Sequence, residues 1–193
     1  MSITSLLAIS LGAILTNNFI FAQFLGICPF LGVSKKSDTA IGMGLAVTFV
    51  MGIASAVCFG VNKLLIALDL GYMQTVAFIL VIAGLVQFIE MFLKKSMPSL
   101  YTALGVYLPL ITTNCAVMGV TILVQREEYD LTTSLLYAVA SSLGFMLALI
   151  LMAGIRERLD TCRVPKALMG TPIALIMAGL MSLAFMAFKG MTS

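Results

Sequence analysis

Histidine and tryptophan are absent from the 193 residues of this chain, and charged side chains are scarce. Only 10% of the residues are Asp, Glu, Lys or Arg, whereas a soluble globular domain carries about 25%. The lack of histidine excludes His-based metal sites, His general bases and Ser/His/Asp triads. The low charge excludes a water-soluble fold and a basic surface for nucleic acid. The chain is therefore expected to lie in a membrane, with any chemistry resting on cysteine, carboxylate, amide or hydroxyl groups.

The few charged residues divide the chain into long apolar runs. A helix needs about 20 mostly apolar residues to cross a hydrocarbon core of ~30 Å. Six runs meet this length, namely 1–34, 39–62, 70–89, 96–125, 131–155 and 167–188. The first segment, MSITSLLAIS, has no positive n-region, so we expect a retained helix rather than a cleaved signal peptide. The sequence predicts an all-α polytopic membrane protein with six transmembrane helices and a single integral membrane domain over residues 1–193.

The connectors between the runs differ in positive charge. The odd-numbered connectors carry eight Lys and Arg residues, and the even-numbered ones together with the tail carry three. Because Lys and Arg accumulate in cytoplasmic loops, we expect both termini to lie on the outer side of the membrane.

Two of the runs are too long for a single crossing. At a rise of 1.5 Å per residue, the run 1–34 would form a helix of about 51 Å. The runs 1–34 and 96–125 also hold amides, glycines and prolines at membrane depth, including Asn17, Asn18, Gln23, Gly26 and Pro29 in one and Pro98, Gly105, Pro109, Asn114 and Gly119 in the other. Irregular backbone is tolerated there only where protein or a cavity covers it. Helices 1 and 4 are therefore predicted to be broken.

The two broken runs occupy corresponding places in the two halves of the chain. Each contains Cys-x-x-x-Gly-Val, which pairs Cys28 with Cys115, and LVIAGLVQFIEM in one half aligns with LIMAGLMSLAFM in the other. A three-helix unit that is duplicated within one chain must have inverted topology. We predict two inverted three-helix repeats, about 1–95 and about 96–193.

Cys28 and Cys115 form a symmetric pair. Counted from the nearest charged connectors, both thiols are expected at one level inside the bilayer, about 10 and 14 Å from its cytoplasmic boundary. Two thiolates are half of what a [2Fe-2S] or [4Fe-4S] cluster needs, so another chain would have to supply the rest. Ordinary packing of two small apolar side chains is the alternative, and the spacing alone leaves it open. Cys58 and Cys162 are expected near opposite faces of the membrane and cannot complete one site.

Polar side chains in the broken runs are candidates for lining a site or an ion path: Thr16, Asn17, Asn18, Thr112, Thr113 and Asn114. Hydrogen bonding between helices is the alternative role of these groups. The sequence has no P-loop and no flavin or nicotinamide fingerprint. We therefore expect no nucleotide-binding catalytic site within the chain.

The strings LTNNFIFAQFLGICPFLGVSKK, LYTALGVYLPLITTNCAVMGV and AGIRERL together resemble the A subunit of the Rnf complex, the ion-translocating ferredoxin:NAD oxidoreductase of bacterial membranes. The resemblance covers nearly the whole chain. The sister family, the E subunit of the Na⁺-translocating NADH:quinone reductase, is similar in length and in both cysteine motifs. Its first helix typically has Glu-Asn where this chain has Asn17-Asn18, and the Cys-Pro-Phe at 28–30 also favours Rnf.

The resemblance implies membership of a redox-driven translocase in the bacterial cytoplasmic membrane. Cys28 and Cys115 match positions that hold half of an intramembrane [2Fe-2S] cluster in these families. Two cysteines of a paralogous six-helix subunit of opposite orientation, of the type of the Rnf E subunit, would complete the cluster. It would relay electrons between ferredoxin-side centres and flavins carried by other subunits, and this flow would drive Na⁺ or H⁺ transport.

Two other functions fit the residues alone. A small-solute or ion transporter can be built on the same inverted repeat, and a structural scaffold would need no chemistry at all. The three hypotheses differ in the role of Cys28 and Cys115, since only the first requires both thiols for electron transfer.

Overall fold

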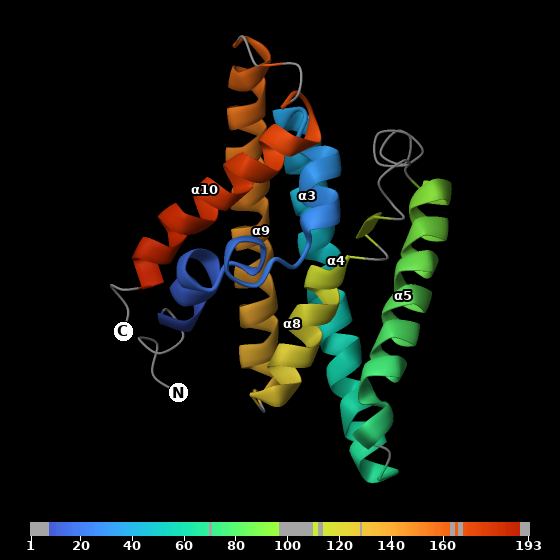
Figure 1. Ribbon diagram of the computed structural model, residues 1–193. Coiled ribbons are helices and arrows are strands. Elements are labelled where there is room, and N and C mark those ends of the chain that lie inside the picture. The colour runs from blue at the N-terminus through green and yellow to red at the C-terminus, as the bar shows by residue number, and fades with distance from the viewer. Residues whose placement is uncertain are drawn as a thin grey trace.

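A computed structural model of the chain describes residues 8–69, 71–96, 110–111, 114–127, 129–162, 165 and 168–189. The regular elements within these ranges are helices (Figure 1). Four described helices are long and apolar enough to cross a membrane, at Ser37–Ala67, Gly71–Met91, Leu131–Asp160 and Thr171–Phe188. The prediction of an all-α polytopic membrane fold is confirmed, and the exact repeat of six spans stays a prediction.

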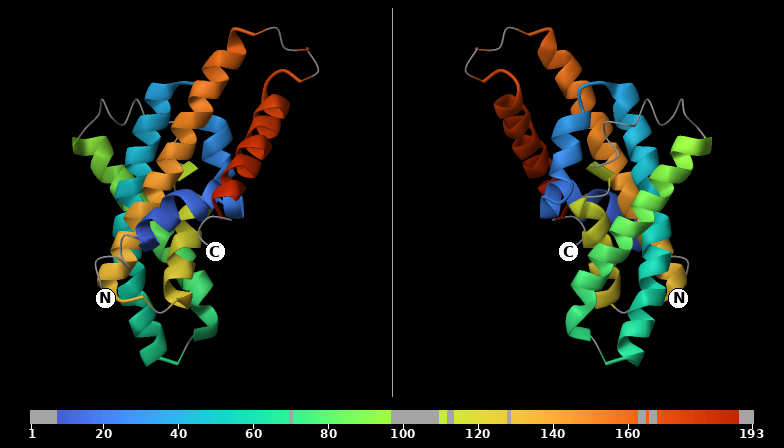
Figure 2. Two further views of the ribbon diagram at one scale, coloured as in Figure 1. Left: turned by 90° about the vertical axis from the view of Figure 1, so that its left-hand side faces the viewer. Right: turned by 90° about the vertical axis from the view of Figure 1, so that its right-hand side faces the viewer.

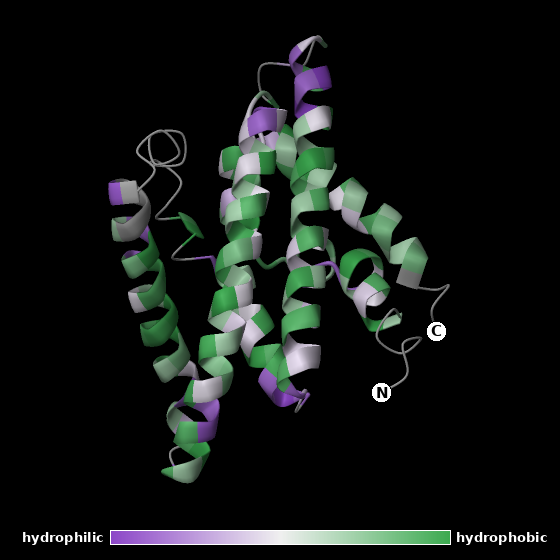
Figure 3. Ribbon diagram, turned by 180° about the vertical axis from the view of Figure 1, so that it is seen from behind, coloured by the Kyte–Doolittle hydropathy of each residue, from purple (hydrophilic) through white to green (hydrophobic). Residues whose placement is uncertain are grey.

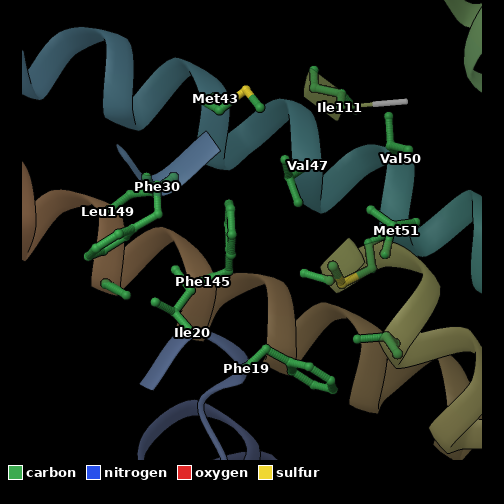
Figure 4. Close-up of a cluster of buried hydrophobic side chains, with 14 of the residues drawn as sticks. Phe19, Ile20, Phe30, Met43, Val47, Val50, Met51, Ile111, Phe145 and Leu149 are labelled. Carbon is green, nitrogen blue, oxygen red and sulfur yellow. The ribbon is translucent and has the colours of Figure 1, made fainter. Parts of the chain in front are cut away.

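Helices α4 (Ser37–Ala67) and α9 (Leu131–Asp160) form the centre of the molecule. They run antiparallel and pack along much of their length (Figure 1). Gly44 of α4 allows the close approach, because an added Cβ there would overlap the side chain of Met146. Apolar side chains fill the space between the two helices and their neighbours, and Figure 4 shows Met43, Val47, Phe145 and Leu149 among them. The charge-free runs 39–62 and 131–155 predicted both helices.

Helix α5 (Gln74–Ser96), preceded by the 3-10 turn η2 (Gly71–Met73), lies against α4. Three amide side chains join α4 and α5 to α8 (Cys115–Arg126). Gln74 Nε2 donates to Asn62 Oδ1 over 2.8 Å, and Asn62 Nδ2 donates to Gln125 Oε1. Since lipid tails are as apolar as leucine, such interhelical hydrogen bonds help to hold transmembrane helices together.

The first apolar run is divided into short pieces, as the sequence predicts. A π-helical turn η1 (Gly12–Thr16) is followed by α2 (Phe19–Gln23) and α3 (Ile27–Val33). The first break falls at the two asparagines before α2. The second contains Phe24 and Gly26, with φ angles of 56° and 82°. The pieces therefore change direction twice within the membrane.

The fourth run lies partly outside the residues that the structure describes. Within them, Asn114 is extended, with φ −69° and ψ 110°, and α8 begins at the next residue. The run is thus interrupted at Asn114. Figure 2 shows α3 and α8 starting near one level and running toward opposite ends of the molecule.

Helix α10 (Thr171–Lys189) crosses the broken first segment. Ser182 Oγ donates to the carbonyl oxygen of Phe21 over 2.7 Å, and the rings of Phe21 and Phe185 lie 4.6 Å apart. Only 6% of the most apolar stretch of α10 is buried. Figure 3 shows hydrophilic residues gathered at the helix ends and mostly hydrophobic residues along the helices between them. Most of α10 is therefore free to face lipid or another protein chain.

Candidate functional site

The two cysteine-bearing segments meet where α3 and α8 begin. Gly26, the residue that precedes α3, donates its backbone N–H to Cys115 Sγ over 2.9 Å. Cys115 is the first residue of α8, and Cys28 is the second residue of α3. The structure thus brings together two motifs that are far apart in sequence, at the breaks in the first and fourth runs.

Gly26 is closely surrounded at this meeting point. An added Cβ would lie 2.7 Å from Phe145 Cε2, 3.2 Å from Ala116 Cβ and 3.3 Å from Asn114 Oδ1. The φ of +82° is also one that residues with a side chain rarely adopt. Glycine is therefore required here both by the backbone and by the contact with α8 and α9.

The two thiols of this pair are accessible from outside the chain. Cys28 is exposed and Cys115 is partly exposed. Cys115 borders an open cleft of about 330 Å³ that Gln23, Met118, Gly119 and Arg126 also line. A group held by another chain can therefore approach both residues.

The other cysteines do not join this pair. Cys58 is buried in α4, and Cys162 is exposed beyond the end of α9. Within the described residues, no group of three or more Cys, Asp or Glu side chains could hold a metal ion. The chain thus offers at most two thiols at one place.

Asn18 closes the first break and ties it to α9. Its Oδ1 accepts the N–H of Ile20 over 3.1 Å, which caps α2. Its Nδ2 donates to the carbonyl oxygens of Ile14, over 3.1 Å, and Gly144, over 2.7 Å. The amide of Asn18 therefore makes a hydrogen bond between helices, which is one of the two roles that the sequence left open.

Asn114 has the corresponding place before α8. Its Oδ1 accepts the N–H of Ala116 over 3.0 Å, but its buried Nδ2 has no hydrogen-bond partner among the residues that the structure describes. Thr112 and Thr113, the polar candidates next to it in the sequence, lie outside the described residues.

The other polar candidates border cavities. Thr16 lines a partly open cavity of about 110 Å³ together with Asn18 and Ser182. Asn17 is exposed and lines an open cleft of about 480 Å³ with Gln23, Glu127 and Tyr137, among others. Gln23 also borders the cleft beside Cys115, so the two clefts adjoin.

The far end of α3 is held by α9 through contacts that the sequence pattern did not predict. Arg156 Nη1 donates to the carbonyl oxygen of Leu31 over 2.8 Å and to Ser34 Oγ over 3.1 Å. Glu157 Oε1 accepts from the backbone N–H and the hydroxyl of Ser37. The string AGIRERL contains both residues, but in the sequence its charges indicate only membrane topology. Both ends of α3 are therefore fixed against the second half of the chain.

The fold and the site define a polytopic membrane protein whose two broken segments meet at a pair of cysteines. A family model described as "Rnf-Nqr subunit, membrane protein" matches residues 6–192, and the chain belongs to this family.

Its relatives are membrane subunits of redox complexes. The chain is 60% identical over 188 residues to the A subunit of the Na⁺-translocating ferredoxin:NAD⁺ oxidoreductase complex of Acetobacterium woodii, covering 97% of this chain and 98% of the relative. It is 56% identical to the A subunit of the ion-translocating oxidoreductase complex of Syntrophotalea carbinolica, with 97% of each chain covered. The corresponding A subunit of Azoarcus sp. is 53% identical over 97% of both chains. The resemblance to the A subunit that the cysteine motifs indicate is confirmed.

Proposed function

We propose that this chain is the A subunit of an ion-translocating ferredoxin:NAD oxidoreductase complex and relays electrons across the membrane interior. In this proposal Cys28 and Cys115 supply half of the ligands of a [2Fe-2S] cluster. The observation that carries the proposal is the hydrogen bond from Gly26 N–H to Cys115 Sγ, which joins the two cysteine motifs at the breaks. The high identity to the A subunits of such complexes supports the assignment.

The donor set fits half of a cluster. Such clusters are usually held by four cysteine thiolates, and this chain brings two cysteine motifs together, with one thiol exposed and the other partly exposed. A partner with two cysteines can therefore reach the same place. We propose that this partner is the paralogous six-helix subunit of opposite orientation, and that other subunits carry the flavin and iron-sulfur centres. A [2Fe-2S] cluster bound here supplies a one-electron relay.

The residues around the thiols prepare them for such a ligand. The Gly26 N–H donates to Cys115 Sγ, and hydrogen bonds to the ligand sulfurs are one of the features that set the potential of an iron-sulfur cluster. Phe145 and Ala116 pack against Gly26 and exclude water from that side of the bond. Arg156 holds the opposite end of α3, so that Cys28 is carried on a short helix fixed at both ends.

Ion transport is the coupled part of the proposal. We propose that the adjoining clefts bordered by Asn17, Gln23 and Cys115 belong to the ion path, with the amides at the breaks providing polar groups at membrane depth. The helix-helix hydrogen bonds of Asn18 give that residue a structural role beside any contact with an ion. The same site in a transporter without electron transfer is the competing function.

The test is iron content in the chain co-expressed and purified with its paralogous partner. We expect two iron atoms per heterodimer and a [2Fe-2S] absorption and EPR spectrum. Cys28→Ser and Cys115→Ser should each abolish the spectrum. The polypeptide purified alone should carry little or no iron, because it offers only two of the four ligands.

The chain provides its own controls. Cys58→Ser and Cys162→Ser remove cysteines that lie away from the pair, and both variants should keep the full iron content. Full iron occupancy in Cys115→Ser would contradict the proposal. Loss of the spectrum in all four variants would show instability of the fold, and a thermal melt of each complex separates this from loss of a ligand.

A further inference from the structure

Two asparagines stand at equivalent breaks in the chain, but only one of them uses its amide hydrogens. Asn18 and Asn114 each precede a helix and each accept the N–H two residues on. The Nδ2 of Asn18 donates to two carbonyl oxygens. The Nδ2 of Asn114 donates to no acceptor within the described part of the chain, although the residue is only 4% exposed. Buried donors are nearly always paired, so an unpaired one indicates an acceptor outside the described residues.

The orientation of the Asn114 amide is fixed by the helix that follows it. Because Oδ1 accepts the N–H of Ala116 over 3.0 Å, the Nδ2 is the atom left over, and an amide flip would place two donors against each other. The free group is therefore a donor. Among the described residues it has no acceptor.

The place of this donor is beside the thiol of Cys115. Asn114 directly precedes Cys115, and both side chains contact the same glycine. Asn114 Oδ1 lies 3.3 Å from the position of a Cβ at Gly26, and Cys115 Sγ accepts the Gly26 N–H over 2.9 Å. The Gly26 amide already donates to this sulfur. A ligand bound at Cys115 would bring further sulfur atoms close to Gly26, the residue that Asn114 and Cys115 both approach.

We propose that Asn114 Nδ2 donates a hydrogen bond to a sulfur atom of the group bound at Cys115 and thereby raises its reduction potential. This inference rests on the proposed function. Reduction adds one electron and negative charge to the sulfur atoms without breaking a bond. A donor in a low-dielectric site stabilises this reduced state more than the oxidised one. Asn114 is thus a positioning and tuning residue and not a ligand.

The test uses two substitutions that keep the helix start. Asp is isosteric with Asn and an equally good N-cap, and Gly at this position destabilises a helix only slightly. Neither provides a side-chain N–H. The purified complex carrying Asn114→Gly or Asn114→Asp is titrated with dithionite, and the EPR signal of the reduced cluster gives the midpoint potential. For Asn114→Gly we expect the ratio of reduced to oxidised cluster at fixed potential to fall about tenfold, which is about 59 mV for one electron.

The added negative charge should make the shift of Asn114→Asp larger than that of Asn114→Gly. Asn18→Ser is the matched control, since it keeps a cap and loses the amide that donates to Ile14 in η1 and to Gly144 in α9. We expect it to lower thermal stability and leave the potential unchanged. An unchanged potential in both Asn114 variants, with the cluster present, would overturn the inference and leave the cluster itself established.

A measurement on the unaltered protein needs no variant. In the reduced complex labelled with ¹⁵N in asparagine side chains, pulsed EPR should detect a nitrogen coupled to the cluster, and the coupling should vanish in Asn114→Asp. The absence of such a coupling would also overturn the inference. A complex without iron in the unaltered protein would instead contradict the proposed function.

Discussion

Asn18 and Gly144 are joined by a hydrogen bond of 2.7 Å from the amide of one to the backbone carbonyl oxygen of the other. The bond connects the break in the first segment to the middle of α9. It is possible because residue 144 has no side chain. An added Cβ there would lie 3.0 Å from the carbonyl oxygen and 3.1 Å from the Cα of Ile14. The backbone of the first segment at Ile14 thus packs directly against the backbone of α9 at Gly144.

Gly144→Ala should therefore destabilise the protein. The new methyl group meets the backbone of Ile14, which cannot move aside as a flexible side chain can. We expect a loss of about 1–3 kcal/mol, as for other overpacked sites. Gly154→Ala on the same helix is the control, because nothing lies within 4 Å of its added Cβ. Thermal unfolding in detergent measures both, and equal melting temperatures would contradict the close approach at Gly144.

Gly26→Ala should separate the two cysteine motifs. The Cβ would meet Phe145 and Ala116, and the φ of +82° would be strained, so α3 must shift and the bond to Cys115 must lengthen or break. We expect iron content of the complex to fall strongly. Gly170→Ala combines a φ of +97° with open space around the Cβ. That control should retain its iron, and a similar loss in both variants would assign the effect to backbone strain alone.

Arg156→Ala should loosen the end of α3 that lies away from the cysteines. The substitution removes two hydrogen bonds from a charged donor, to Leu31 O and Ser34 Oγ. Such bonds contribute about 1.5–3 kcal/mol each when buried, and partial exposure of Arg156 places the expected loss toward the lower end. Arg158→Ala removes an exposed charge two residues on and should change stability by less than about 0.5 kcal/mol. The melting temperatures of the complexes that carry each variant measure the two losses of stability. A larger loss for Arg158→Ala would contradict the role of Arg156.

The orientation expected from the charge count can be tested with thiol labelling. Tyr72, at the turn between α4 and α5, is 79% exposed, and Cys162 is exposed beyond α9. In a Cys162→Ser background, Tyr72→Cys should react with a membrane-impermeant maleimide in whole cells. Native Cys162 should react only in inverted vesicles. The reverse pattern would place both termini on the cytoplasmic side.

The sequence predicted the long helices well because their ends are set by local charge. The run 131–155 matches the start of α9, which continues to Asp160 because Arg and Glu side chains are tolerated where a helix leaves the apolar region. The break at Asn17 and Asn18 was also predictable, since two amides at membrane depth demand hydrogen-bond partners. Phe24, with its φ of 56°, was not, because nothing in a phenylalanine marks a left-handed backbone.

The sequence proposed the residues of the candidate site, but it could not predict their contacts. The repeated Cys-x-x-x-Gly-Val identified Cys28 and Cys115 as a pair. The bond from Gly26 to Cys115, and the different use of Asn18 and Asn114, depend on how the two halves pack together. The chain has sixteen glycines, and nothing in the sequence distinguishes Gly26 as the one that contacts Cys115. Likewise, whether an amide such as that of Asn18 lines a site or bonds to another helix depends on its distance from α9. The spacing of residues in the sequence does not give that distance.

The contact between Asn18 and Gly144 also sets the order of folding during synthesis, because it cannot form before α9 has been made. The two residues are 126 positions apart, and at about 5–20 residues per second the ribosome needs about 6–25 s to pass from one to the other. During that interval the amide of Asn18 has no partner on α9. Until the second half of the chain is inserted, the polar groups at this break must therefore be hydrogen-bonded by water or contacted by the insertion machinery. Only then can the first segment pack against α9.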